Sequence, residues 1–299
     1  MTAMDATFIR GVIPALVTPM GEDESIDRDG LGKLIDFVIG NGVHGLFTVG
    51  TAGESWALSP DEKRLLFEWT VELTAGRVPV YVGTAANTTR EAVWLAEQAQ
   101  EAGADCLSVM TPYFVTPSDP QMYDHFSAIA KSVDVPVLLY DLPARTGNGL
   151  SVDLVVSLAE DHANIVGIKD SSGDLSQSVE YLRRGPEGFR LIMGRDTLIY
   201  AALVHGAAGA IAASANVAPD LGAAIYDRYL QGDLAGALDY QTRLAPLRLA
   251  FGIGTHPAML KAGAELMGVP VGPPRLPVQR LRPEENERLR SVLTGMGKL

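Results

Sequence analysis

The sequence has little cysteine, little lysine and no long apolar run. Its 299 residues include one cysteine, Cys106, which can form neither an internal disulfide nor a thiolate metal site, so a reducing compartment is expected. No stretch approaches the roughly 18 uninterrupted apolar residues of a membrane span. The first residues, MTAMDATFIR, lack the basic start and the apolar run of a signal peptide. We therefore expect a soluble protein of the cytoplasm.

Positive charge is also scarce. Lysine and arginine total 24 against 36 acidic residues, which gives a net charge of −12. An acidic surface repels phosphate backbones and anionic lipids, so nucleic acid and membranes are poor partners for this chain. Hydrophobic residues make up 47% of the sequence and charged residues 20%. This balance favours a large buried core over disorder.

Short apolar runs alternate with longer amphipathic segments along the chain. The Ser59-Pro60-Asp61-Glu62 sequence is a helix start, with a capping side chain followed by proline and two acids. The runs predict eight strands, over residues 11–18, 45–49, 78–84, 104–110, 135–140, 165–169, 189–193 and 208–212. Helices are predicted between them, over residues 27–39, 60–73, 88–100, 120–132, 152–160, 175–183, 197–205 and from 219.

Eight strands, each followed by a helix, predict a (β/α)8 TIM barrel. The strands are apolar on both faces, as buried parallel strands are. An open doubly wound sheet is the alternative, but it calls for a glycine-rich turn after the first strand, and the sequence there is ALVTPM. We expect residues 1–218 to form the catalytic barrel. Residues 219–299 should form a C-terminal helical region packed on the barrel.

Lys169 is the first candidate for chemistry. The chain has six lysines, and Lys169 alone follows an apolar strand run, Ile165–Ile168. In a barrel mouth its ammonium would be poorly solvated, which lowers its pKa and favours the neutral amine. A neutral amine is the nucleophile that forms a Schiff base with a ketone. The alternative from the sequence alone is an ion pair with Asp170 or another acid.

Three further residues follow predicted strands. Tyr140 could shuttle a proton to and from a Schiff-base intermediate, or could simply pack its ring. Thr51, between glycines, could bind a small carboxylate through its hydroxyl and the loop amides, or could lie in an ordinary turn. Arg145 suits a second carboxylate, with a surface ion pair as the alternative.

Other chemistries lack their motifs. The sequence has no HExxH helix, no G-x-S-x-G elbow and no Walker loop, and its five histidines have no metal-ligand spacing. Cys106 lies in the middle of a predicted strand and is interpreted as a packed thiol. We therefore expect no metal site.

Several segments together resemble one family. Residues 50–55, GTAGES, are similar to its GTTGES loop, residues 140–147, YDLPARTG, to its Y-N-x-P-x-R-T-G segment, and residues 167–174, GIKDSSGD, to its block around a Schiff-base lysine. The family is that of dihydrodipicolinate synthase and N-acetylneuraminate lyase, and the resemblance covers nearly the whole chain.

The resemblance implies a barrel with C-terminal helices, homotetramers built from tight dimers, and pyruvate chemistry without a cofactor. Its partners would be a 2-keto acid and an aldehyde. It also implies roles for individual residues: Lys169 as the nucleophile, Tyr140 as the proton shuttle, and Thr51, Ala52 and the Gly50 loop amides as ligands of the pyruvate carboxylate, with the backbone near Ile211 lining the pocket.

Two departures from the family pattern bear on the reaction. Ala52 replaces the second threonine of the loop, so one carboxylate-binding hydroxyl is missing. Phe114 stands where synthases of the family carry a tyrosine that reaches a neighbouring subunit's site, and a phenyl ring cannot pass a proton. Tyr113 is adjacent, but neighbouring residues of an extended segment point in opposite directions. Arg145, in contrast, matches the synthase arginine that binds the second substrate.

These departures lead us to expect a carbon–carbon lyase, a class I aldolase that cleaves a 2-keto-3-deoxy sugar acid reversibly to pyruvate and an aldehyde. The alternative is 4-hydroxy-tetrahydrodipicolinate (dihydrodipicolinate) synthase activity, which condenses pyruvate with aspartate semialdehyde. More remote alternatives are a metal-dependent barrel aldolase and a non-catalytic relative that only binds a keto acid. The non-catalytic relative would be expected to lose Lys169 or Tyr140.

Overall fold

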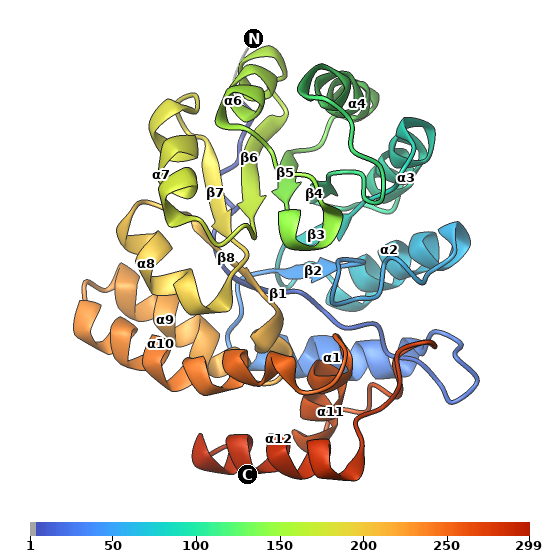
Figure 1. The fold of residues 1–299 in the computed structure, drawn as a ribbon, viewed down its shortest axis with the longest axis vertical. Helices are drawn as coiled ribbons and strands as arrows, with labels where there is room; N and C mark the ends of the chain where they lie inside the picture. The colour runs from blue at the N-terminus through green and yellow to red at the C-terminus, as the bar shows by residue number, and fades with distance from the viewer. Residues whose placement is uncertain (1–3) are drawn as a thin grey trace.

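The structure is a computed structural model that describes residues 4–299. Within these residues eight parallel strands form one sheet in the order β1-β8-β7-β6-β5-β4-β3-β2, and the ring of strands with helices around it is visible in Figure 1. The strands are β1 Gly11–Pro14, β2 Leu46–Thr48, β3 Val80–Gly83, β4 Cys106–Met110, β5 Val137–Asp141, β6 Ile165–Asp170, β7 Arg190–Met193 and β8 Gly209–Ala212.

The two end strands of the sheet, β1 and β2, approach each other and nearly close the ring. Ala15 and Phe47 form a parallel bridge between them, and the Leu16 amide donates to the Phe47 carbonyl over 2.9 Å. A closed parallel sheet with a helix after each strand is the TIM-barrel architecture. The fold class predicted from the sequence is confirmed.

Helices surround the ring and continue beyond it. They are α1 Arg28–Gly40, α2 Pro60–Thr74, α3 Thr89–Glu101, α4 Asp119–Ser132, α5 Pro143–Thr146, α6 Val152–Asp161, α7 Leu175–Arg184, α8 Ile199–Val204, α9 Pro219–Leu230, α10 Leu234–Leu249, α11 Ala258–Leu266 and α12 Pro283–Gly295, with 3₁₀ turns η1 Asp196–Leu198, η2 Ala213–Asn216 and η3 Ala250–Gly252. Ser59 and Glu62 form the predicted start of α2 as a reciprocal capping box. Among residues 4–299, no helix combines the length and the apolar character that crossing a membrane requires.

Two local predictions needed correction, and one short helix was missed. The first strand ends at Pro14 instead of residue 18, because the Val17 amide leaves the sheet and donates to the Asn216 side chain. The predicted helix over residues 197–205 begins with the tight turn η1, and α8 proper starts at Ile199. The short helix α5 was not predicted, although Pro143 at its start and left-handed Gly147 after its end are ordinary helix boundaries.

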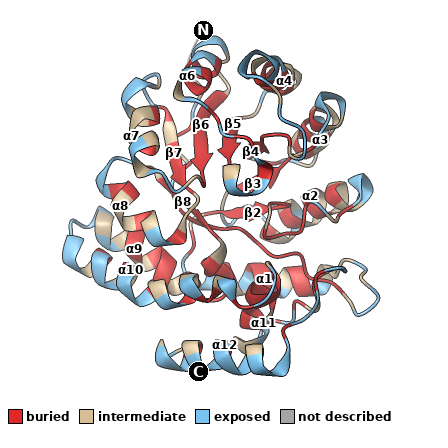
Figure 2. Cartoon of the chain, in the orientation of Figure 1, coloured by how far each residue is buried: buried red, intermediate tan, exposed pale blue. Residues whose placement is uncertain are grey.

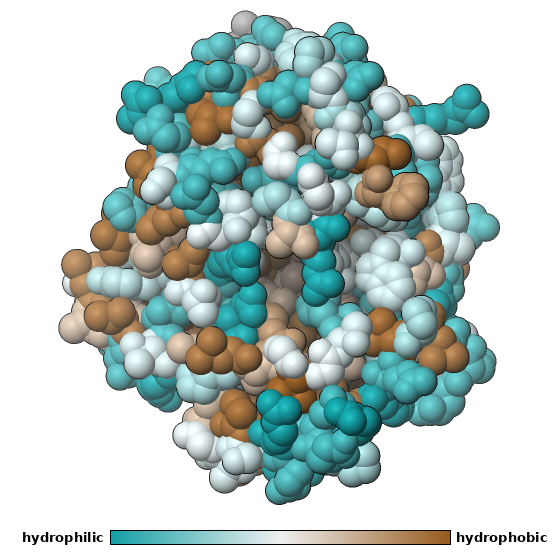
Figure 3. Space-filling model, in the orientation of Figure 1, coloured by the Kyte–Doolittle hydropathy of each residue, from teal (hydrophilic) through white to brown (hydrophobic). Residues whose placement is uncertain are grey.

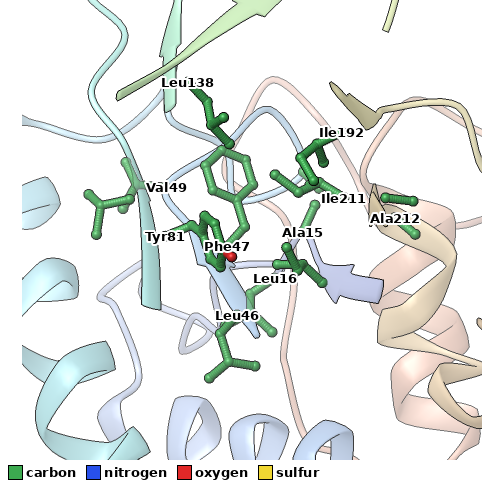
Figure 4. Packing of buried hydrophobic residues seen from close by; sticks show 14 of the residues in the cluster. Ala15, Leu16, Leu46, Phe47, Val49, Tyr81, Leu138, Ile192, Ile211 and Ala212 are labelled. Carbon is green, nitrogen blue, oxygen red and sulfur yellow. The ribbon is translucent and has the colours of Figure 1, made fainter. Parts of the chain in front are cut away.

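Large apolar side chains fill the barrel interior. Figure 4 shows Phe47 and Tyr81 close to Leu138, Ile192 and Ile211, which come from five different strands. All five side chains are buried, and the strands are the most continuously buried elements in Figure 2. The interior is therefore a packed core, and space for a ligand can arise only at its rim.

The helices after the last strand extend to this rim. Helix α10 packs against α9 and against η1, which follows β7, while α11 contacts η2, which follows β8. The C-terminal helices lie at the bottom of Figure 1, with α12 furthest from the strands. The boundary proposed between residues 218 and 219 stays a prediction, because α9, α10 and α11 all contact elements of the barrel.

Candidate active site

Lys169 lies near the end of β6 and points into the rim of the barrel. Its side chain is 3% exposed, and its Nζ lies 3.8 Å from the ring centroid of Tyr140 and 4.2 Å from that of Phe47. Burial lowers the pKa of Lys169, an effect that Tyr140 and Asp196 partly oppose. The surroundings therefore favour the neutral amine that the sequence suggested.

The structure does not show the alternative for Lys169, an ion pair with Asp170. Asp170 accepts a hydrogen bond from the Ser172 amide over 2.8 Å and another from the Ser178 hydroxyl over 2.5 Å. Neighbouring residues of a strand point to opposite faces, which directs the Asp170 carboxylate away from the lysine. None of the ion pairs among residues 4–299 includes Lys169.

Tyr140 comes to the lysine because β5 and β6 are paired strands. Their register sets Tyr140 opposite Lys169. The hydroxyl oxygens of Tyr140 and Thr51 are 3.4 Å apart, at the long end of hydrogen-bond distances. A short movement would make this a good hydrogen bond, and the two hydroxyls would then form a relay beside the amine.

The Thr51 loop, residues 50–55, is fixed by contacts with the rest of the chain. The Thr18 hydroxyl donates to the Gly53 carbonyl over 2.6 Å. A Cβ atom at Gly50 would lie 2.3 Å from the Phe47 ring, so only glycine fits there. Glu54 has a positive φ of 59°, and its buried carboxylate lies 2.8 Å from the buried Lys261 amine of α11. This ion pair joins the loop to the C-terminal helices.

A cavity of about 320 Å³ collects most of the predicted site residues. Its lining includes Thr51, Ala52, Tyr140, Arg145, Lys169 and Ile211. Gly50 does not line this cavity, but borders a small separate void together with Thr51 and Tyr140. Figure 3 shows a hollow at the centre of this face of the molecule, bordered by hydrophilic residues. The volume suits a small metabolite.

Two more predicted residues lie outside this cavity. Phe114 has a positive φ of 73° and is 96% exposed. Tyr113 is held through its backbone, whose amide donates to the Asn87 side chain over 2.9 Å. Neither side chain lines the cavity within the described chain, so a role for Phe114 in catalysis requires a second subunit.

The C-terminal region supplies residues that sequence reasoning missed. Arg248 at the end of α10, with Phe251 and His256, lines the outer part of the cavity. Burial, with Arg145 and Arg248 nearby, lowers the pKa of His256 to about 4, so the imidazole is neutral at physiological pH. The segment around them has glycines and a proline but no apolar periodicity, so the sequence gives no signal for its position. Only the folded structure shows that it lies at the barrel mouth.

Two buried acids lie on the strands that carry Tyr140 and Lys169. Asp141 and Asp170 are register partners on β5 and β6, and both are fully buried. Burial, and then the charge of Asp170, raise the pKa of Asp141 to about 7. The Leu150 amide donates to Asp141 over 3.2 Å.

Fold and site together define a class of protein: a (β/α)8 barrel with a buried lysine of lowered pKa on its sixth strand. A family model described as the dihydrodipicolinate synthetase family matches residues 8–296. The chain therefore belongs to the dihydrodipicolinate synthase family, whose members are enzymes of the class I aldolase type. The resemblance drawn from the sequence is confirmed.

Relatives are similar over nearly their whole length. A 4-hydroxy-tetrahydrodipicolinate synthase from Methanopyrus kandleri is 39% identical over 292 residues, which is 97% of this chain and 97% of that protein. The crystal structure of dihydrodipicolinate synthase from Aquifex aeolicus has a TM-score of 0.93 and 35% identity over 96% of this chain and 98% of that one. YagE, an E. coli prophage protein of the same family crystallised with pyruvate, has a TM-score of 0.94 and 31% identity over 97% and 99%.

Proposed function

We propose that this protein is a pyruvate-dependent enzyme that forms a Schiff base through Lys169. The observation that carries the proposal is the burial of this amine against Tyr140 at the mouth of the barrel. The neutral amine would attack C2 of pyruvate. The carbinolamine would lose water to give the imine, and loss of a proton from C3 would give an enamine that attacks an aldehyde carbon. Hydrolysis would then release the product and regenerate the amine.

Tyr140 and Thr51 serve this sequence of steps as the proton relay. The Tyr140 hydroxyl, 3.4 Å from that of Thr51, can donate a proton to the departing hydroxyl of the carbinolamine and take one back later. The Thr51 hydroxyl and the amides of Gly50 and Ala52 hold the pyruvate carboxylate, and the backbone at Ile211 completes the wall. These steps need neither a metal nor a cofactor.

For the second substrate we propose aspartate semialdehyde, so that the protein acts as a 4-hydroxy-tetrahydrodipicolinate synthase. The names of the similar relatives support this choice, against the sugar-acid lyase that the sequence alone favoured. Arg145 also supports it. This side chain lines the cavity and is exposed, and its guanidinium could bind the carboxylate of the semialdehyde in a bidentate manner.

Cleavage of a 2-keto-3-deoxy sugar acid remains a second candidate, because one observation favours it. Phe114 has no hydroxyl, so a relay that borrows a hydroxyl at this position from a second subunit would be broken. Cleavage by way of the same Schiff base would need only Lys169 and Tyr140 from the residues named above.

We also propose a homotetramer built as a dimer of dimers. Phe114 supports this assembly, because a phenyl ring that is 96% exposed is costly to leave in water. The single cysteine is compatible with the cytoplasmic location expected from the sequence.

Three incubations of the purified protein test the proposal. Borohydride with pyruvate should add one reduced pyruvate to Lys169, as located by peptide mass spectrometry. Without borohydride, pyruvate with aspartate semialdehyde should be consumed in equal amounts, whereas a lyase should release pyruvate from 2-keto-3-deoxygluconate. Absence of the Lys169 adduct would reject the Schiff-base proposal. An adduct with pyruvate release but no condensation would favour the second candidate.

A further inference from the structure

The outer half of the cavity carries more positive charge than the proposed reaction has so far used. Three arginines line it, Arg145, Arg195 and Arg248, against one carboxylate, Asp196. The whole chain has the opposite balance, with a net charge of −12. A concentration of cations in a concave site of an acidic protein indicates an anionic ligand.

The three arginines are not equivalent. Arg248 is partly neutralised, because its Nε lies 3.5 Å from the Asp196 carboxylate, and its guanidinium stacks over the Phe251 ring at 4.6 Å. Arg145 and Arg195 take part in none of the ion pairs among the described residues. These two side chains therefore have charge available for a ligand.

Arg195 is held in a seat made by the segment after Lys169. Its Nε donates to the Ser171 carbonyl and its Nη2 to the Ser172 carbonyl, both over 3.1 Å. A Cβ atom at Gly173 would lie 3.0 Å from Arg195 Nε, so the glycine leaves room for the guanidinium. Backbone carbonyls orient the group without neutralising it, and its remaining nitrogen, Nη1, has no protein partner in these contacts.

We propose that Arg195 is a specificity-determining residue that, together with Arg145, binds an acid group at the far end of the molecule joined to Lys169. The inference rests on the proposed function, since Lys169 defines the near end. The ligand class is a 2-keto acid adduct with a second carboxylate or a phosphate remote from the keto carbon. Arg195 follows β7, but its guanidinium is hydrogen-bonded to the segment directly after Lys169. The distance between the two side chains is therefore fixed, and it selects adducts of a matching length. Arg145, on α5, is exposed and less constrained.

A pair of keto acids of equal length tests this without knowledge of the natural aldehyde. 2-Oxoadipate and 2-oxohexanoate both have six carbons and differ in the carboxylate at the far end. Each is titrated against the protein with borohydride, and the concentration that half-saturates the Lys169 adduct is read by mass spectrometry. Pyruvate is titrated in parallel as the measure of Schiff-base formation itself.

The protein should trap 2-oxoadipate at a concentration at least about tenfold lower than 2-oxohexanoate, as expected for one charge-assisted contact. Arg195→Ala should remove most of this difference and leave 2-oxohexanoate and pyruvate unchanged, and Arg195→Lys should keep part of it. Arg243→Ala, at an exposed arginine of α10 paired with Asp239, is the matched control and should behave like the parent protein.

Three outcomes would overturn the inference while leaving the Schiff base intact. The first is equal trapping of the two six-carbon acids by the parent protein. The second is an Arg195→Ala variant that weakens all three keto acids alike, which would indicate a structural role. The third is a preference that survives Arg195→Ala and disappears only with Arg145→Ala. Failure of pyruvate to form any adduct would instead reject the proposed function, and this inference with it.

Discussion

The ion pair between Glu54 and Lys261 gives the sharpest prediction about stability. Glu54 is fully buried, Lys261 is 1% exposed, and the charged atoms are 2.8 Å apart. The Lys261 amine also donates to the Pro273 carbonyl over 2.6 Å, and the Arg275 amide donates to the other Glu54 oxygen over 2.8 Å. Lys261→Met would leave a buried carboxylate with one amide donor.

Removing one partner of such a pair costs about 3–5 kcal/mol, most of it the cost of the charge left behind. We expect Lys261→Met to lower the free energy of unfolding by that amount in urea titrations. The double variant Glu54→Gln with Lys261→Met should recover at least half of the loss, because no buried charge remains. The pair anchors the Thr51 loop, so the single variant should also raise the KM for pyruvate.

Lys63→Met is the matched control. Lys63 is also a buried lysine, but its partner Glu91 is 39% exposed and 3.7 Å away, so its loss should cost no more than about 1 kcal/mol. The reasoning would be refuted if the two single variants lost equal stability, or if the double variant were no more stable than Lys261→Met.

Three further predictions concern the site. Phe114→Tyr should raise turnover with pyruvate and aspartate semialdehyde at least about tenfold if the missing hydroxyl limits the relay, and an unchanged steady-state rate would dismiss that argument. Tyr140→Phe should lower kcat by about 10²–10⁴ in the same assay while borohydride still traps pyruvate, more slowly, and an unchanged kcat would mean that the hydroxyl does not relay the proton. Asp141, with its pKa raised to about 7 by burial and by Asp170, favours folding most below its ordinary pKa near 4, and this contribution is lost as the pH rises through 7. The stability of Asp141→Asn relative to the parent should therefore rise between pH 5 and pH 8 in urea titrations, and the same difference at both pH values would contradict the shift.

Much of the fold was predictable because its signals are local. Apolar runs indicate the eight buried strands, and caps such as Ser59 indicate the helices between them. In a barrel the order of the strands in space follows their order in the chain. Where a strand ends is set by long-range contacts. Asn216, about 200 residues away, removes the Val17 amide from the first strand, and no local pattern contains that contact.

The site was predictable to the same extent. Lys169 and Tyr140 follow strands, and parallel strands end at one rim, so their meeting could be expected. Arg248 and His256 could not be placed, because they enter the cavity from beyond the last strand along an irregular path. The choice between synthase and lyase depends on Phe114, whose side chain leaves the subunit, and a single chain holds little information about such a contact.

Trapping of pyruvate on Lys169 tests the central claim most directly. Borohydride reduction of the protein with pyruvate should add one reduced pyruvate, and the modified peptide should contain Lys169 and none of the other five lysines. The Lys169→Arg variant should fold like the parent and take up none. An adduct on another lysine, or condensation activity that persists in Lys169→Arg, would contradict the account.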